Sequence, residues 1–269
     1  AMAELLVFSL VQDIALLPSV EILAGSLTGG LSGKYDLPGL GHYLPEAVLR
    51  KFNHTDIHKI LENVPGVYFQ EEDGFGLRPN IGLRGTSTER SSKITIMEDG
   101  ILAAPAPYAS PSAYYFPTAG RMHAVEVLKG SSQIKFGPFT TGGAINMLST
   151  PIPSGFKGRV NLSSGNFGNR NLHSWVGYGN DYLGLVAETF QHQADGFKTL
   201  PNGDPTGFDK RDYLLKFRLN TGPDARIFQS LTFKAGQVSE QSHETYLGLS
   251  REDFEEDPYQ RYAASQKDL

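Results

Sequence analysis

Five short phrases punctuated by glycine follow one another in the middle of the chain and constrain its fold more than any other feature. They occupy residues 80–85, 97–100, 106–111, 125–130 and 136–146. Glycine lacks a Cβ and is the usual residue where the backbone is left-handed or where two segments approach closely. The phrases therefore predict a compact, turn-dense domain whose short strands end at glycines.

The composition indicates a folded, turn-rich protein. Of 269 residues, 39% are hydrophobic, and there are 30 glycines and 16 prolines, which is too balanced for a disordered chain. A net charge of −5 argues against a nucleic-acid partner, and the absence of cysteine excludes disulfides. Residues 5–24 are the most apolar stretch but are interrupted by polar residues and by Pro18, so they do not form a membrane-spanning helix. Whether residues 1–16 are a signal-peptide remnant or part of the mature protein stays open.

The glycine phrases lie in a predicted α+β domain. Residues 55–64 predict a short helix, with Thr55 as its N-cap and Pro65-Gly66 as its end. The segments 67–70, 94–97 and 124–128 predict strands. Residues 25–41, rich in glycine and serine, predict a flexible linker before this domain.

The pattern changes after Pro153 to longer segments with alternating apolar residues, at 159–164, 171–178, 183–191, 213–220 and 226–235. In the fourth, Tyr213, Leu215 and Phe217 lie on one face and Lys216 on the other. Short connections, such as 179–181 and 221–224, alternate with long ones at 195–209 and 239–262. Alternation alone leaves two interpretations equally open, the strands of an outer-membrane barrel and a soluble antiparallel sandwich.

The ordered phrases resemble the plug domain of TonB-dependent outer-membrane receptors, and among these the ferric dicitrate transporters. The phrases that carry the resemblance are Asn80-Ile81-Gly82-Leu83-Arg84-Gly85, Met97-Glu98-Asp99-Gly100, Ala106-Pro107-Tyr108-Ala109-Ser110-Pro111, Val125-Glu126-Val127-Leu128-Lys129-Gly130 and Phe136–Asn146. The resemblance implies an N-terminal flexible segment at 1–31, an α+β plug domain at 32–152, and the first antiparallel strands of a transmembrane β-barrel at 153–269. A plugged barrel of this kind has about 22 strands, so the chain is expected to hold only the first of them.

The same resemblance implies a function. We expect TonB-dependent uptake of a ferric chelate of the citrate or siderophore type across the outer membrane of a Gram-negative bacterium, by a monomeric barrel. The implied partners are TonB with its inner-membrane energising complex, the ferric chelate, and outer-membrane lipid or lipopolysaccharide. No catalytic residues, resident metal or cofactor are expected.

Residues that match the outward-facing loops of ferric dicitrate receptors are candidates for substrate binding. Phe75 and Ser110 occupy positions where those receptors carry polar side chains, and the apolar Phe75 departs from that pattern. Neighbouring aromatic side chains either contact an organic chelate or pack the plug, and nearby arginines either attract an anionic complex or are solvated. These further candidates are Arg78, Arg90, Tyr108 and Tyr114.

Two other sets of residues take roles from the resemblance. Arg84 and Lys129 are expected to hold the plug to barrel glutamates, although a lysine cannot make the two-pronged contact of an arginine. An N-terminal segment resembles the stretch that contacts TonB, which would add a strand to an exposed sheet edge. This segment consists of Leu17, Pro18, Ser19, Val20, Glu21, Ile22 and Leu23.

Motifs typical of enzymes are incomplete. His54 and His58 have the spacing of zinc ligands but lack a catalytic glutamate between them, and we expect both on a solvated helix face. The phrase at 137–146 lacks the Gly-Lys-Ser/Thr ending of a phosphate-binding loop. The alternatives to chelate uptake are uptake of a non-iron nutrient, a surface binding or adhesion protein without transport, and a soluble β-rich hydrolase.

Overall fold

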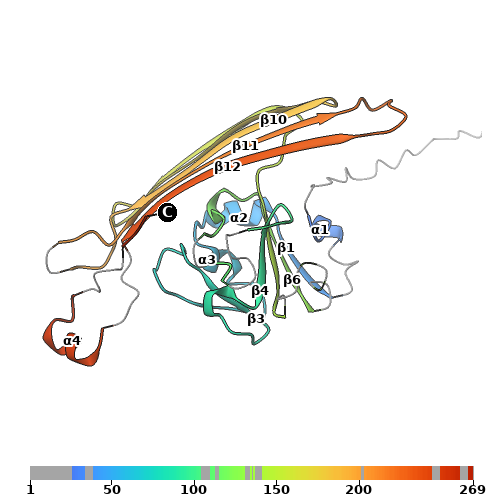
Figure 1. The fold of residues 1–269 in the computed structure, drawn as a ribbon. Coiled ribbons are helices and arrows are strands. Elements are labelled where there is room, and N and C mark those ends of the chain that lie inside the picture. Colours follow the sequence, from blue (N-terminus) through green and yellow to red (C-terminus); the bar gives the residue numbers. More distant parts are fainter. Residues whose placement is uncertain are drawn as a thin grey trace, which may run out of the picture.

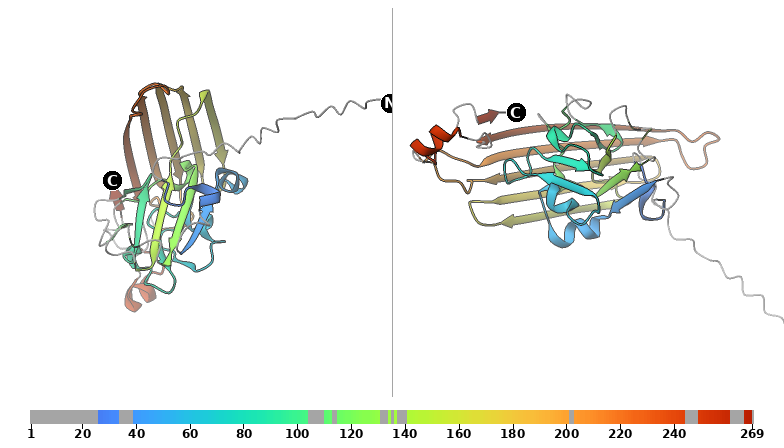
Figure 2. Two further views of the ribbon diagram at one scale, coloured as in Figure 1. Left: turned by 90° about the vertical axis from the view of Figure 1, so that its right-hand side faces the viewer. Right: turned by 90° about the horizontal axis from the view of Figure 1, so that it is seen from below.

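The computed structural model describes residues 26–33, 39–103, 110–112, 115–130, 134, 136, 141–200, 203–243, 249–260 and 266–268. These residues form a small α+β domain and a separate, long antiparallel sheet that arches over it (Figure 1). From the side, the strands of the long sheet stand in one row, with the small domain against their concave face (Figure 2).

The small domain, here called the plug, is built on a five-stranded sheet of order β1-β6-β7-β4-β5. All its neighbours are antiparallel except β4 and β7, which are parallel. Strands β2 and β3 form a separate hairpin. The bounds are β1 Leu40–Leu44, β2 Val67–Gln70, β3 Asn80–Leu83, β4 Ile94–Glu98, β5 Ile101–Leu102, β6 Ala124–Lys129 and β7 Gly143–Leu148. The three predicted strands of this domain are thus present.

Short helices complete the plug, and one corrects a prediction. Helices α2 (Glu46–Phe52) and α3 (Ile57–Leu61) lie between β1 and β2, and the 3₁₀ helices η2 (Glu89–Ser91) and η3 (Ala119–Arg121) precede β4 and β6. The predicted N-cap Thr55 is wrong by one position. Asp56 caps α3, because its carboxylate accepts a hydrogen bond from the His58 amide at 2.8 Å.

The segment before the plug is more ordered than a flexible linker. Residues 26–28 lie against the plug, helix α1 (Gly30–Gly33) follows, and β1 begins at Leu40 as an edge strand. The linker prediction for 25–41 is therefore wrong for these residues. The hydroxyls of Ser26 and Thr28 donate hydrogen bonds to Glu126 of β6 and hold the segment, although glycine and serine by themselves favour a flexible backbone.

The hydrophobic core of the plug lies on one face of its sheet. Ile57 and Leu61 of α3 pack there against Val127 of β6 and Ile145 of β7, and all four are fully buried. The burial of a helix face against the inward side chains of a sheet is what stabilises a two-layer domain.

The long sheet has the order β13-β12-β11-β10-β9-β8, with every neighbour antiparallel. Its strands are β8 Gly155–Ser164, β9 Arg170–Gly179, β10 Leu183–Ala194, β11 Phe208–Asn220, β12 Ser230–His243 and β13 Gln266–Asp268. Four of the five predicted strands are present and are longer than predicted, whereas the fifth, predicted at 226–235, begins only at Ser230, so the short connection predicted at 221–224 runs to Gln229. The predicted loop at 239–262 is wrong at its start, since β12 continues to His243, and within it α4 (Arg251–Glu256) forms behind a Ser250 capping box.

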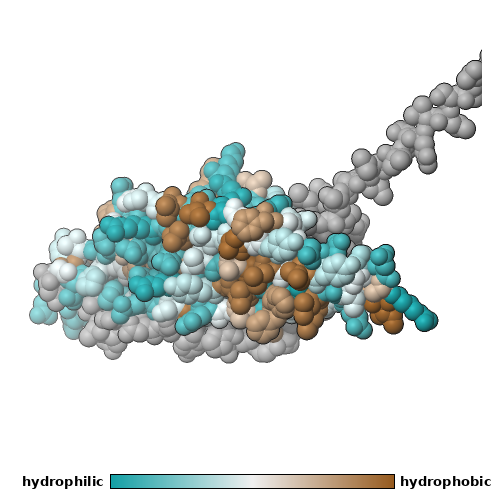
Figure 3. Space-filling model, turned by 90° about the horizontal axis from the view of Figure 1, so that it is seen from above, coloured by the Kyte–Doolittle hydropathy of each residue, from teal (hydrophilic) through white to brown (hydrophobic). Residues whose placement is uncertain are grey.

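The polarity of the long sheet is opposite to that of a soluble sandwich. On β11, Tyr213, Leu215 and Phe217 point outward and are 37–46% exposed, whereas Lys216 points at the plug and is 9% exposed. Apolar residues of neighbouring strands join them in a patch on the outward face, bordered by hydrophilic residues (Figure 3). A soluble sandwich buries its apolar face, so the sandwich interpretation is wrong. No helix within the described ranges is long and apolar enough to cross a membrane.

The glycines of the opening phrases serve two different geometries. Gly85, Gly100 and Gly130 have φ values of 79–82°, in the left-handed region. Gly82 instead allows close approach, because a Cβ there would lie 2.6 Å from the Thr86 carbonyl oxygen and from the Tyr68 ring.

These two geometries predict different costs for alanine. We expect Gly85→Ala to lower the free energy of unfolding by about 1–2 kcal/mol, since it strains only the backbone and meets open space. Gly82→Ala should cost more, about 2–3 kcal/mol, because the Thr86 backbone must shift. Urea unfolding of the protein in detergent micelles measures both, and equal costs would show that close approach at Gly82 is not required.

Candidate plug interface and ligand-facing loops

A buried arginine of the plug joins it to the long sheet. Arg121 ends η3 and is 3% exposed. Its guanidinium donates to Asp212 of β11 at 2.7 Å and to both oxygens of Glu98 of β4 at 2.9 Å. Burial lowers the pKa of Arg121, but the Glu98 and Asp212 charges outweigh it and hold this pKa above its ordinary value. One cation thus links two carboxylates from different parts of the molecule.

Two lysines of the long sheet continue the network around the turn after β4. Lys234 of β12 contacts Glu98 at 2.6 Å and Asp99 at 2.7 Å, and Lys216 of β11 contacts Asp99 at 3.3 Å. Asp99 also accepts from the amide of Ser149 at 2.9 Å. Burial raises the pKa of Asp99, but the two lysine charges outweigh burial and bring it to about 2.

A second group of charges lies nearer the long loops. Arg78 of the plug is 2% exposed and contacts Glu240 of β12 at 2.7 Å. Lys210 of β11 contacts the same carboxylate at 3.1 Å. Since all three side chains are buried, Glu240 balances one cation from each partner of the interface.

A third group lies toward β8 and β9. Glu188 of β10 accepts from Thr150 and contacts His173 of β9, each at 2.6 Å, and the other ring nitrogen of His173 lies 3.2 Å from Arg50 of α2. Nearby, Glu46 of α2 pairs with Arg159 of β8. Each described strand of the long sheet from β8 to β12 therefore carries a polar side chain that meets the plug.

This interface is polar where a domain core would be apolar. Buried ion pairs add little net stability, because desolvation offsets their attraction. They do fix orientation, since a misplaced partner leaves a buried charge without compensation. Both surfaces would also be well hydrated if they separated. The arrangement can hold a domain in one position without making its withdrawal from the sheet prohibitively unfavourable.

The structure places the described ligand candidates in different environments. Phe75 packs against Phe197 and Phe208, with ring centroids 5.3 and 4.8 Å apart. Arg78 lies in the buried interface and not on a solvated loop. Arg90 is partly exposed and contacts Glu72 at 2.9 Å. Arg90 and the half-buried Ser110 both remain candidates for ligand binding.

The loop that carries Phe75 is fixed by one aspartate. Asp73 accepts hydrogen bonds from the amides of Gly76 at 2.7 Å and Arg78 at 2.9 Å. Gly74 and Gly76 have φ values of 78° and 76°, which the turn requires. The side chain of Phe75 is thereby directed at Phe208 of β11 and at Phe197 in the loop before it, which supports a packing role.

Three expected sites lie outside the described residues. Tyr108, Tyr114 and the segment Leu17–Leu23 fall there, so their roles stay predictions. Of the other aromatic residues near these loops, Phe116 is 2% exposed and Tyr115 packs against the plug core, so both pack the plug.

The predicted plug–barrel residues Arg84 and Lys129 lie together on the plug. They line one cavity with Pro65, Gly66 and Leu40, and every lining residue belongs to the plug. Arg84 is exposed, and Lys129 is buried and donates to the Pro65 carbonyl. Their contact with barrel glutamates stays a prediction.

The expected solvated histidine face is wrong for His58. This side chain is 4% exposed, lies 2.7 Å from Glu71 and packs on Phe69. His54 is exposed and stacks on Phe52. His58 is buried within α3 because Phe69 of β2 covers this flank of the helix.

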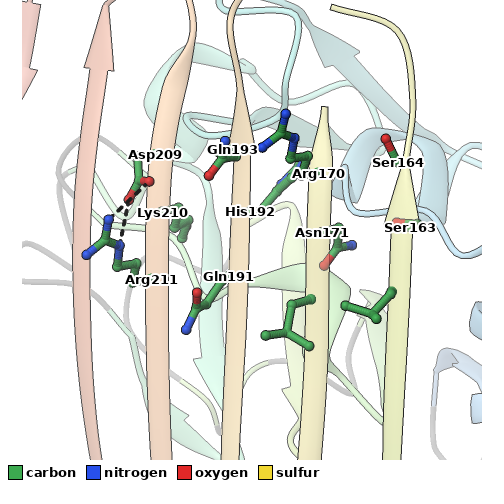
Figure 4. Close-up of a pocket in the computed structure, with 12 residues that line it drawn as sticks. Ser163, Ser164, Arg170, Asn171, Gln191, His192, Gln193, Asp209, Lys210 and Arg211 are labelled. Carbon is green, nitrogen blue, oxygen red and sulfur yellow. Dashed lines mark hydrogen bonds and ion pairs between the residues drawn. The ribbon is translucent and has the colours of Figure 1, made fainter. Parts of the chain in front are cut away.

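A shallow depression crosses β8 to β11 near their long-loop ends (Figure 4). Gln191, Gln193 and the Asp209–Arg211 pair belong to the outward-facing set, whereas the buried His192 and Lys210 belong to the plug-facing set. The depression is thus lined by residues from both faces of the sheet.

The residues that hold the interface were missed from sequence. Glu98, Arg121, Asp212 and Lys234 were not singled out as contacts. A signal was present on β11, where Lys210, Asp212 and Lys216 share the face opposite the apolar residues. Because this charged face of β11 is the one turned away from the apolar exterior, its charges indicate that a polar partner covers it.

Comparison with known proteins identifies the domain that covers this face. Residues 34–144 match the family model of the TonB-dependent receptor plug domain. Over this segment the chain is a TonB-dependent receptor plug domain. The vitamin B12 transporter BtuB of Vibrio vulnificus is 27% identical over 171 residues, which cover 62% of this chain and 27% of BtuB.

Solved structures of TonB-dependent receptors share the fold. The unliganded ferric citrate transporter FecA matches 90% of this chain and 37% of its own, with a TM-score of 0.67 and 22% identity. The siderophore receptor PirA from Acinetobacter baumannii matches 78% of this chain and 33% of its own, with a TM-score of 0.59 and 16% identity. The predicted fold, a plug followed by antiparallel barrel strands, is confirmed. The chain spans 27–37% of the length of these relatives.

The network predicts a large effect for loss of its central cation. Arg121→Met leaves Glu98 and Asp212 buried without their shared partner and should lower the free energy of unfolding by about 3–5 kcal/mol. The control is Arg211→Met, whose pair with Asp209 is exposed and should cost less than about 1 kcal/mol. Urea unfolding in micelles measures both, and a small cost at Arg121 would contradict a central role.

The depressed pKa of Asp99 predicts an acid transition. Because its folded pKa of about 2 lies below the ordinary value of 3.8, its stabilisation is complete above about pH 4 and is lost as the pH falls toward 2. The expected loss is about 2 kcal/mol. Asp99→Asn should lack this component, which unfolding at pH 5 and pH 2 measures. Identical acid losses in both proteins would contradict it.

Proposed function

We propose that the protein acts in TonB-dependent uptake of a ferric chelate, of the citrate or siderophore type, across the bacterial outer membrane. The observation that carries the proposal is the closure of a charged sheet face by a plug domain held through ion pairs. Transport requires a plug that is held in one orientation when no ligand is transported and that can still move away from the sheet. A polar interface meets both requirements, because its groups are satisfied by one another when closed and by water when open.

The outward face of the long sheet supports an outer-membrane location. Its apolar side chains occupy residues 156–162 on β8 and 213–219 on β11. Roughly seven residues at ~3.3 Å each extend about 20 Å, near the ~25 Å apolar band of outer-membrane strands. Outer-membrane lipid, with lipopolysaccharide outside, is the partner proposed for this surface.

The choice of a ferric chelate rests on names of relatives and on a few side chains. The matched structures include a ferric citrate transporter, siderophore and enterobactin receptors, and the copper transporter OprC. Arg90 and Ser110 are polar candidates for an anionic chelate, whereas Phe75, which packs against Phe197 and Phe208, offers no polar contact to citrate. Uptake of a non-iron nutrient is the second candidate, favoured by the matches to BtuB and OprC.

Uptake of labelled iron tests the proposal. Cells that express the receptor should accumulate ⁵⁵Fe from ferric citrate or a siderophore only when the inner membrane is energised. Deletion of Leu17–Leu23 should abolish uptake and leave chelate binding to de-energised cells unchanged, because only the TonB contact is removed. Undiminished uptake after the deletion would exclude TonB dependence, and binding without any uptake would favour a surface binding protein.

Fluorescence titration of the purified receptor separates cargo from mechanism. Quenching by ferric citrate, a catecholate siderophore, cobalamin or Cu²⁺ identifies the class that binds. Binding of cobalamin or copper and of no iron chelate would replace the ferric-chelate proposal by the second candidate.

A further inference from the structure

Glu126 is a fully buried carboxylate in the middle of β6. It lies on the sheet face opposite the plug core, since its neighbours Val125 and Val127 are the residues that enter that core. No salt bridge is found for it among the described residues. A buried carboxylate without a cation is costly unless hydrogen bonds satisfy it.

The donors come mostly from the segment that precedes the plug. Glu126 accepts from the hydroxyl of Ser26 at 2.6 Å, from the amides of Leu27 and Thr28 at 2.8 and 3.1 Å, and from the hydroxyl of Thr28 at 2.6 Å. Asn146 of β7 supplies a fifth bond at 2.7 Å. Four of the five donors therefore belong to three consecutive residues about 100 positions earlier in the chain.

An apolar contact reinforces this attachment. Leu27 packs against the buried cluster of Met97, Leu128 and Ala144 on the same sheet face. Departure of the segment would uncover these side chains and leave Glu126 with Asn146 as its remaining donor. The polar and apolar contacts are coupled, because both are made by the same three residues.

We propose that Glu126 is the residue that anchors the N-terminal segment, and that a pull on this segment first reaches the plug at an interior strand of its sheet, β6. The inference rests on the proposed function, since the pull is that of TonB on Leu17–Leu23. Residues 26–28 lie between that segment and β1 along the chain. Tension is met by the Glu126 contacts before it reaches the edge strand.

Hydrogen exchange in the purified receptor without TonB tests the anchor. The amides of Leu27 and Thr28 should be protected, and Thr28→Val should speed their exchange about tenfold, the equivalent of one charge-assisted hydrogen bond. Glu126→Gln should act in the same direction. Protection of β7 reports that the plug remains folded in each variant. Unprotected wild-type amides, or rates unchanged in both variants, would overturn the proposal.

The matched control is Thr88→Val, which removes a threonine hydroxyl bonded to Gln70 on the plug surface. It should leave exchange at residues 26–28 unchanged. An equal acceleration in this control would show a general loosening of the plug and overturn the specific role of Glu126.

Single-molecule pulling tests the route of the force. With a handle on the N-terminus of the full receptor, the first rupture should move to lower force in Thr28→Val and Glu126→Gln but not in Thr88→Val. An unchanged first rupture would overturn the route. Neither experiment requires transport, so a failed uptake assay with an intact anchor would reject the proposed function alone.

Discussion

The polar contact between the plug and the inward face of the long sheet is the constraint on which the rest of the structure depends. Arg121, Asp99 and Arg78 each meet an opposite charge on β11 or β12. Since these groups are buried, each must be matched by a partner at hydrogen-bonding distance. The positions of the turn after β4, of η3 and of the Asp73 loop are therefore fixed relative to strands far away in sequence.

The same constraint accounts for the inverted polarity of the long sheet. A strand has only two faces, and on β11 charges are needed toward the plug, so apolar residues remain for the outer face. A surface of this kind is unfavourable in water and favourable against lipid. The ion-paired interface and the apolar exterior are thus two consequences of one arrangement.

The plug itself combines a conventional core with a second, less stable attachment. Its α3 side is held by apolar packing, while the opposite side is covered by Ser26–Thr28 through one carboxylate and one leucine. Local stability differs within a domain according to such contacts. The N-terminal segment is expected to detach before the core strands separate, which suits a domain that receives force at one end.

Much of the fold was predictable from local pattern. The glycine phrases, the β11 alternation and the turn residues specified strands and their ends, because these depend on backbone geometry and on side-chain period. The α3 cap was mispredicted by one position, and the environment of His58 was mispredicted because the residues that cover it, Phe69 and Glu71, lie outside the helix. Sequence could not pair Arg121 with Asp212 or Glu126 with Thr28, because those contacts join residues about 90–100 positions apart.

By itself, the sequence determined the plug and most of the strands, which follow from short-range order. Only the tertiary structure decided which charges are buried, which face of the long sheet is outward, and that Arg78 belongs to the interface. The physical reason is that burial and charge pairing are properties of two surfaces brought together. The residues of one surface alone do not specify which other surface will contact it.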